Sequence, residues 1–256
     1  MLAKDERLVF LHLPKCAGTS LHALLSNFFK PDEICPHRGD VITTVNAETL
    51  RRYKFFSGHF TKFGVDAIPG PKRVITVLRD PYQRILSLYY FWRSHRPDVI
   101  ERDNLKGPRA ARELGLLDFL KSNRPEVVAN INNTLTRSLL GPIHLSQSAG
   151  YRLRNVNYAV ETAMLNLQRF NFVAFADTMD EDVPLLLSIL GFPSVDEIPR
   201  LNTFDKLKDA AGLEAVEREE ITPEINAALE SIITLDRPFF ARAQRMRHTL
   251  RCPYPN

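Results

Sequence analysis

The chain has 256 residues, of which 44% are hydrophobic and 25% charged, and it carries a formal net charge of +4. This composition is typical of a soluble globular protein and argues against a disordered chain. The sequence contains no apolar run long enough to span a bilayer, and its mild positive charge suits an anionic ligand without indicating nucleic acid. Its three cysteines lack metal-ligand spacing and argue against a disulfide framework, so we expect a reducing compartment.

Short apolar segments alternate with helical patterns along the chain. The apolar segments predict buried strands at residues 8–13, 54–57, 73–78 and 172–175. Apolar periodicity predicts helices at residues 19–29, 47–53, 81–93, 116–121, 133–140, 156–169 and 181–190, with one or two more within 222–247. This alternation favours an α/β fold with a short parallel sheet flanked by helices and a mostly helical second half. We expect one domain over residues 1–256.

Residues 94–112 lack periodicity and contain Pro97, Gly107 and Pro108 among scattered charges. Such composition is typical of loops, and long loops in compact domains are usually functional or disordered. We expect a mobile loop beside the functional site, with a disordered insertion as the alternative.

The first predicted strand runs into Pro14-Lys15-Cys16-Ala17-Gly18-Thr19-Ser20, where a helix begins. The first N–H groups of a helix lack intrahelical partners and lie at the positive end of its dipole, so a lysine-bearing turn here is a candidate anion site. It differs from the P-loop of NTPases, whose lysine directly follows a glycine, because Lys15 precedes Gly18. The alternative is an ordinary strand-to-helix turn capped by Thr19 or Ser20.

A second strand-to-helix unit begins where the third predicted strand ends, at Arg79, and Ser87 lies about two turns into its helix. Ligands of parallel sheets bind outside the carboxyl ends of the strands, so we expect Arg79 and the Lys15 turn to face one crevice. A guanidinium matches a phosphate dianion, and a hydroxyl adds a donor. The alternative places Arg79 in an ion pair with Asp80 and Ser87 on a solvated face.

These two units resemble the cofactor motifs of sulfotransferases that use 3′-phosphoadenosine 5′-phosphosulfate (PAPS). The Lys15 turn is similar to their 5′-phosphosulfate loop, and the pattern Arg-Asp-Pro-x-x-Arg-x-x-Ser-x-Tyr at residues 79–89 is similar to their 3′-phosphate motif. The resemblance, strong over roughly the first ninety residues, implies a P-loop-like three-layer fold. It also implies transfer of a sulfuryl group from PAPS to a hydroxyl.

The resemblance assigns roles to individual residues. It implies that Lys15 stabilises the leaving phosphate oxygen, that Arg79 and Ser87 bind the 3′-phosphate, and that Arg84 is structural. The residues implied to bind the 5′-phosphate through their backbone, with the hydroxyls of the last two assisting, are Cys16, Ala17, Gly18, Thr19 and Ser20. We expect no metal, because the sulfuryl group carries less charge than a phosphoryl group and the sequence shows no cluster of carboxylates or histidines.

His59 is the candidate general base, which sulfuryl transfer needs in order to deprotonate the acceptor. It follows a predicted strand and a glycine, and Ser57-Gly58-His59-Phe60 resembles the uronyl/heparan sulfate 2-O-sulfotransferase branch, where a histidine after a glycine is the base. That branch carries a second histidine where this chain has Ser57. The alternative is a satisfied buried histidine. His12, on the first strand, is expected to be structural.

Weaker similarities involve Arg137, a candidate contact to acceptor or phosphosulfate with an exposed helix face as the alternative, and Asn202, near the nucleoside side. We expect a carbohydrate or other hydroxyl acceptor as partner. If Met1 is the natural start, we expect a cytoplasmic location, and otherwise the luminal domain of a membrane-anchored enzyme. Two other functions stay open: a nucleotide kinase or other NTPase, and a catalytically silent glycan-binding module.

Overall fold

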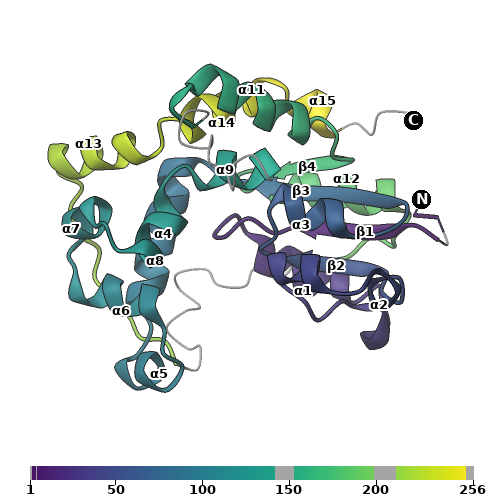
Figure 1. The fold of residues 1–256 in the computed structure, drawn as a ribbon, viewed down its shortest axis with the longest axis horizontal. Helices are drawn as coiled ribbons and strands as arrows, with labels where there is room; N and C mark the ends of the chain where they lie inside the picture. Colours follow the sequence, from purple (N-terminus) through teal and green to yellow (C-terminus); the bar gives the residue numbers. More distant parts are fainter. Residues whose placement is uncertain (1, 4, 142–152, 199–211, 252–256) are drawn as a thin grey trace.

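The computed structural model describes residues 2–3, 5–141, 153–198 and 212–251. At its centre lies a sheet of four parallel strands in the order β2-β1-β3-β4 (Figure 1). The strands are β1 (Arg7–Leu11), β2 (Phe55–Gly58), β3 (Lys72–Leu78) and β4 (Phe172–Phe175). The predicted α/β class and all four predicted strands are therefore confirmed, with small shifts at the strand ends.

Burial of the strands on both faces explains their sequence pattern. Every residue of β2 and β4 is buried, and Val9, Phe10 and Leu11 of β1 are fully buried. A strand covered on both faces needs a continuous apolar run, not alternation. The register places Leu11 opposite Gly58 on one side and Thr76 on the other. The loops that follow β1, β2 and β3 therefore all leave the sheet at one edge.

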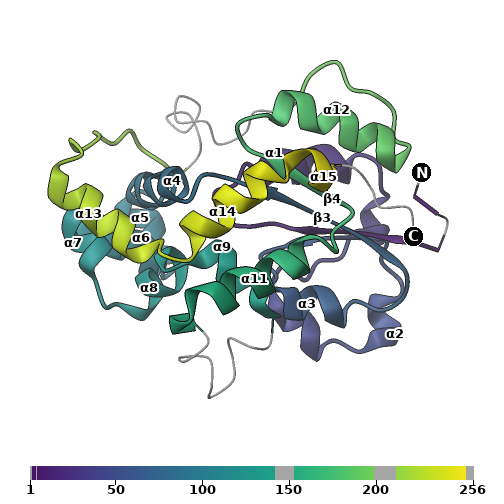
Figure 2. The ribbon, with the colours of Figure 1, turned by 90° about the horizontal axis from the view of Figure 1, so that it is seen from above.

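Helices cover both faces of the sheet, as Figure 2 shows. On one side lie α1 (Gly18–Ser26) and α12 (Met179–Leu190), and on the other lie α2 (Ala47–Leu50), α3 (Lys62–Ala67) and α11 (Val156–Leu167). Short 3-10 turns at Pro31–Glu33 and Asp40–Thr44 link α1 to α2. The helices α9 (Thr134–Leu140) and α14 (Asp236–Arg245) pack on α11, and α15 (Arg247–Arg251) contacts β4.

A second lobe, built from helices, extends from the sheet and has its own apolar cluster (Figure 1). The helix α4 (Pro81–Arg93) runs from the end of β3 into this lobe. Its other helices are α5 (Pro97–Arg102), α6 (Lys106–Glu113), α7 (Leu116–Lys121), α8 (Pro125–Ile131) and α13 (Pro223–Ile232). Tyr89, Phe119 and Leu229 are fully buried here. The lobe thus fixes the far half of α4.

The prediction of a mobile loop at residues 94–112 is wrong, because this segment contains α5 and α6. Pro97 is the first residue of α5 and Pro108 lies in the first turn of α6, where the missing N–H of proline leaves no hydrogen bond unmade. Gly107 packs so closely against Trp92 that a Cβ would lie 2.7 Å from its ring. The prolines and glycine therefore start and dock helices in this segment.

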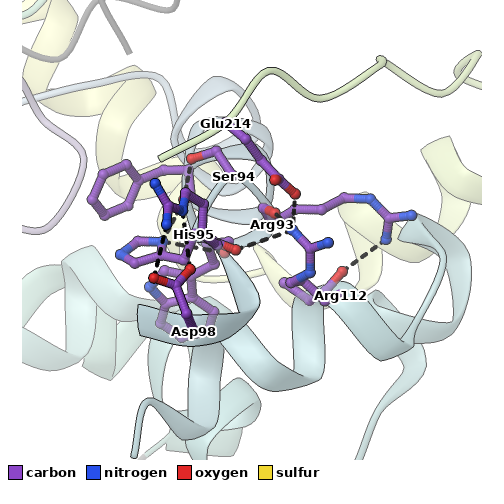
Figure 3. A network of polar contacts seen from close by, with 10 residues as sticks. Arg93, Ser94, His95, Asp98, Arg112 and Glu214 are labelled. Carbon is purple, nitrogen blue, oxygen red and sulfur yellow. Dashed lines mark hydrogen bonds and ion pairs between the residues drawn. The ribbon is translucent and has the colours of Figure 1, made fainter. Parts of the chain in front are cut away.

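Polar contacts tie α6 to the end of α4 and to residues 212–221, which we call the strap (Figure 3). Arg93 Nη1 donates to the carbonyl of Ala111 at 2.8 Å. Arg112 donates to the carbonyl of His95 at 3.0 Å and pairs with Glu214 of the strap. The backbone N–H of Glu214 donates to the carbonyl of Ser94 at 2.8 Å. The strap is thereby held across the end of α4.

Candidate active site

A cavity of about 910 Å³ opens at the carboxyl edge of the sheet. Its walls come from the β1–α1 loop, the start and middle of α4, the turn after β4, the strap, and α14. The residues discussed from the sequence that line this cavity are His12, Lys15, Ala17, Gly18, Thr19, Ser20, Arg79, Asp80 and Ser87. Most of the predicted cofactor residues thus share one cavity.

The β1–α1 loop has an unusual backbone. Lys15 and Ala17 have φ values of 64° and 58°, in the left-handed region that non-glycine residues rarely adopt. Such strain persists where the surrounding structure holds it, and it concentrates at functional sites. Ala17 occupies the N-cap position of α1, and an alanine side chain has no acceptor for the N–H groups of the first turn. This helix start is therefore suited to an anion, and neither Thr19 nor Ser20 is its N-cap.

Lys15 is the cation of this loop. Its Nζ lies 3.7 Å from the centroid of the Phe91 ring, and its backbone carbonyl accepts a hydrogen bond from Arg79 Nη1 at 3.2 Å. Burial, followed by the charge of Arg79, lowers the pKa of Lys15 to about 8. Two close cations in a partly dehydrated site favour a bound anion, because the anion offsets both the desolvation of Lys15 and its repulsion by Arg79.

Arg79 and Ser87 reach the cavity from β3 and α4. Arg79 directly follows β3, while Ser87 faces the cavity from the second turn of α4. The carboxylate of Asp80 accepts a hydrogen bond from the N–H of Gln83 at 2.9 Å, capping α4, and lies 3.4 Å from Arg237. Asp80 thus stabilises the helix start and pairs with a residue of α14.

Two further residues of these motifs, Cys16 and Arg84, are not among the residues that line the cavity. Cys16 is fully buried, and burial raises the pKa of its thiol to about 11, so its side chain is uncharged. Arg84 is also fully buried and donates from Nη2 to the carbonyl of Asn130 at 3.0 Å and to Oγ1 of Thr134 at 3.2 Å. Arg84 therefore connects α4 to α8 and α9.

His59 is held in a defined orientation just beyond β2. Its Nδ1 lies 2.7 Å from the carbonyl of His12, and its backbone N–H donates to the carbonyl of Arg38 at 2.7 Å. A Cβ on Gly58 would lie 2.3 Å from that same Arg38 oxygen, so a glycine is required beside His59. Because a carbonyl only accepts, Nδ1 carries the proton and Nε2 presents a lone pair.

The surroundings of His59 keep it neutral near pH 7. Its side chain is solvent-exposed but flanked by protein atoms, and this partial desolvation lowers its pKa below the usual 6.5. The hydrogen bond to His12 raises the pKa and the charge of Arg38 lowers it. His59 is not among the residues that line the cavity. His12 is one of them, and the centroids of the His59 and His12 rings are 4.5 Å apart.

Other predicted residues lie elsewhere. Arg137 is on α9, outside the residues that line the cavity. Asn202 and Cys252 lie outside the described residues. Within the described ranges, no group of histidine, cysteine and carboxylate side chains could hold a metal ion. None of the helices that the structure describes combines the length and apolar character needed to cross a membrane.

Distant segments contribute cavity walls that were not predicted from the sequence. Arg218, Glu219 and Ile221 of the strap and Phe240 and Gln244 of α14 line the cavity. No motif marks them, because they reach the site only through long-range packing. His12 was expected to be structural, yet it lines the cavity. Its place directly after a strand that ends at this edge was a usable signal.

Comparisons with known proteins identify a sequence relative, a solved structure and a family model that resemble this chain. Over 97 residues, corresponding to 34% of this chain and 26% of the relative, the sequence is 35% identical to heparan sulfate 2-O-sulfotransferase 1 of Xenopus laevis. The match thus spans about a quarter of that relative's length. A crystal structure of a sulfotransferase from Alicyclobacillus acidocaldarius aligns over 97% of both chains with a TM-score of 0.45 and 16% identity. A model of the sulfotransferase family matches residues 1–241. The chain belongs to the sulfotransferase family.

Proposed function

We propose that this protein transfers a sulfuryl group from PAPS to a hydroxyl of a carbohydrate-type acceptor. The observation that carries the proposal is the meeting of the Lys15 loop with Arg79 and Ser87 in one cavity. These groups come from two strand ends and from the second turn of α4. An anion-binding loop and a separate phosphate-binding pair suit a nucleotide with phosphates at both its 5′ and 3′ positions.

The cavity suits such a nucleotide in charge and shape. Lys15 and Arg79 provide two cations, and the start of α1 provides N–H groups. At Gly18 the backbone is open toward the cavity, whereas a side chain there would collide with His12. Among the acidic residues that line the cavity, Asp80 and Asp177 are paired with Arg237 and Arg247. At the loop itself the two neighbouring cations, Lys15 and Arg79, favour an anion.

The residues also supply the two catalytic functions that the transfer needs. His59, with Nε2 unprotonated, takes the proton of the acceptor hydroxyl. Lys15 stabilises the negative charge that develops on the leaving phosphate oxygen. The backbone of residues 16–20 and the hydroxyls of Thr19 and Ser20 hold the 5′-phosphate, and Arg79 and Ser87 hold the 3′-phosphate.

The similarity to heparan sulfate 2-O-sulfotransferase 1 and the exposure of His59 support a carbohydrate acceptor. Ser57, which stands where that branch has a second histidine, is buried. Arg137, outside the cavity, is proposed to contact the acceptor and not the nucleotide.

The test is transfer of labelled sulfate from PAPS to a panel of acidic polysaccharides, neutral oligosaccharides and small alcohols. Binding of adenosine 3′,5′-bisphosphate (PAP) and of ATP–Mg²⁺ is measured beside it. We expect preferential binding of PAP and transfer to at least one glycan. Preferential binding of ATP–Mg²⁺ would identify an NTPase or kinase, and PAP binding without transfer to any acceptor would identify a non-catalytic module.

A further inference from the structure

His12 lies between the two parts of the proposed reaction centre. One edge of its ring meets Gly18 so closely that a Cβ there would lie 2.0 Å from Cδ2 and 2.2 Å from Nε2. Its ring also lies tilted against that of His59, with centroids 4.5 Å apart. The ring therefore touches both the phosphate loop and the proposed base.

The hydrogen-bonding environment of the His12 ring favours a proton on Nε2, the nitrogen beside the phosphate loop. The residue is 8% exposed, and its Nδ1 has no hydrogen-bond partner among the described residues. Phe10 stacks on the ring at 5.3 Å and holds its plane. Because no acceptor meets Nδ1, the proton is better placed on Nε2, at the edge beside Gly18, where a bound anion would accept it.

The charged and titratable groups around His12 are His59, Arg38, His22 and Lys15. Burial, and then these groups, lower the pKa of His12 to about 3. The ring is therefore a neutral imidazole at physiological pH. Such a ring donates one hydrogen bond and is too weak a base to compete with His59 for a proton.

We propose that His12 is a further catalytic residue, whose Nε2–H donates a hydrogen bond to a non-bridging oxygen of the sulfuryl group during transfer. The inference rests on the proposed function. In an in-line transfer, sulfur passes between the phosphate held by the loop and the hydroxyl that His59 deprotonates. The His12 side chain contacts both the loop and His59. Donors that are already in place where charge shifts accelerate group transfer.

The proposed step balances without a further reactant. The bond from the acceptor oxygen to sulfur forms as the bond from sulfur to the nucleotide phosphate oxygen breaks. The electron pair of the broken bond stays on that phosphate oxygen, beside Lys15. The acceptor proton moves to Nε2 of His59, and His12 keeps its own proton throughout.

The first test compares the affinities of PAPS and PAP, which differ by the sulfuryl group, using calorimetry and no acceptor. His12→Phe keeps a flat ring beside Phe10 but removes the N–H. We expect its PAPS affinity to fall about 5- to 10-fold and its PAP affinity to stay within about two-fold. With an acceptor from the panel, kcat should fall about 100-fold. His12→Gln, whose amide nitrogen lies near the position of Nε2, should recover part of both losses, and His22→Gln is the matched control.

Equal loss of PAP and PAPS affinity in His12→Phe would show a structural role and overturn the proposal, as would wild-type affinity for both nucleotides. A second measurement needs no variant fold: ¹⁵N NMR of the wild type should show a neutral His12 with Nε2–H, shifted by PAPS and not by PAP. An Nδ1–H tautomer would overturn the proposal. Failure of the wild type to bind either nucleotide would overturn the proposed function itself. If the wild type binds both and His12→Phe leaves the ratio of PAPS to PAP affinity unaltered, only the role of His12 is refuted.

Discussion

Replacing Gly18 with alanine should disturb the phosphate loop by more than the size of one methyl group indicates. Gly18 is the first residue of α1, and a Cβ there would lie 2.0 Å from a ring carbon of His12, whereas ordinary contact begins at 3.4 Å. The ring and the helix start would have to separate by more than about 1 Å. His12 is packed between Phe10 and His59, so the displacement has to be shared with these neighbours.

The expected size of the effect follows from two opposing contributions. Overpacking a buried site costs about 1–3 kcal/mol, and the better helix propensity of alanine offsets at most about 1 kcal/mol. Because a 2.0 Å approach lies far inside ordinary contact, the upper part of the overpacking range applies. We therefore expect the free energy of unfolding, measured by urea denaturation, to fall by about 1–2 kcal/mol. A shift of this size in the loop should also weaken PAP binding about ten-fold or more.

Two further variants separate this explanation from a general intolerance of glycine substitution. Gly39→Ala is the matched control, because Gly39 has an extended backbone and a Cβ there would meet no described atom within 4 Å. The double variant Gly18→Ala/His12→Ala removes the ring and with it the collision, so its loss of stability should be smaller than the sum of the single losses. Wild-type stability and PAP affinity in Gly18→Ala, or strictly additive losses in the double variant, would refute the reasoning.

The remaining predictions concern the base, the loop cation and the 3′-phosphate site. His59→Ala should lower kcat by about 100-fold or more with PAP affinity unchanged, and equal transfer rates would remove it as the base. Because the pKa of His59 is lowered below 6.5, kcat/KM should stay level near pH 7 and fall only as the pH drops below that pKa and the base becomes protonated. With a pKa of about 8, Lys15 loses its charge as the pH rises, so PAP affinity should fall above about pH 8, and Lys15→Met should abolish that dependence. Ser87→Ala should weaken PAP about 3- to 10-fold and leave adenosine 5′-phosphate, which lacks the 3′-phosphate, unaffected; equal weakening of both would place Ser87 elsewhere.

The parts of the site that are local in sequence were predictable. Lys15 and Arg79 each follow a buried strand, and the parallel register brings the ends of β1 and β3 to one edge. Their convergence in one cavity therefore follows from strand order alone. Residues 94–112 were predicted wrongly because α5 and α6 are short and polar, and their burial depends on partners such as Trp92 that the local sequence does not reveal.

The strap shows why the rest of the cavity could not be predicted. Glu219 lies 130 positions from Tyr89 in sequence, yet the Tyr89 hydroxyl donates to its carboxylate at 2.6 Å. The backbone N–H of Glu219 donates in turn to the hydroxyl of Tyr90 at 2.9 Å. Two adjacent tyrosines of α4 thus hold one strap residue, and Ser87 lies on the same helix one turn earlier. The cavity wall formed by the strap therefore depends on α4 being fixed by the helical lobe. A substitution deep in that lobe can alter nucleotide binding without touching the site.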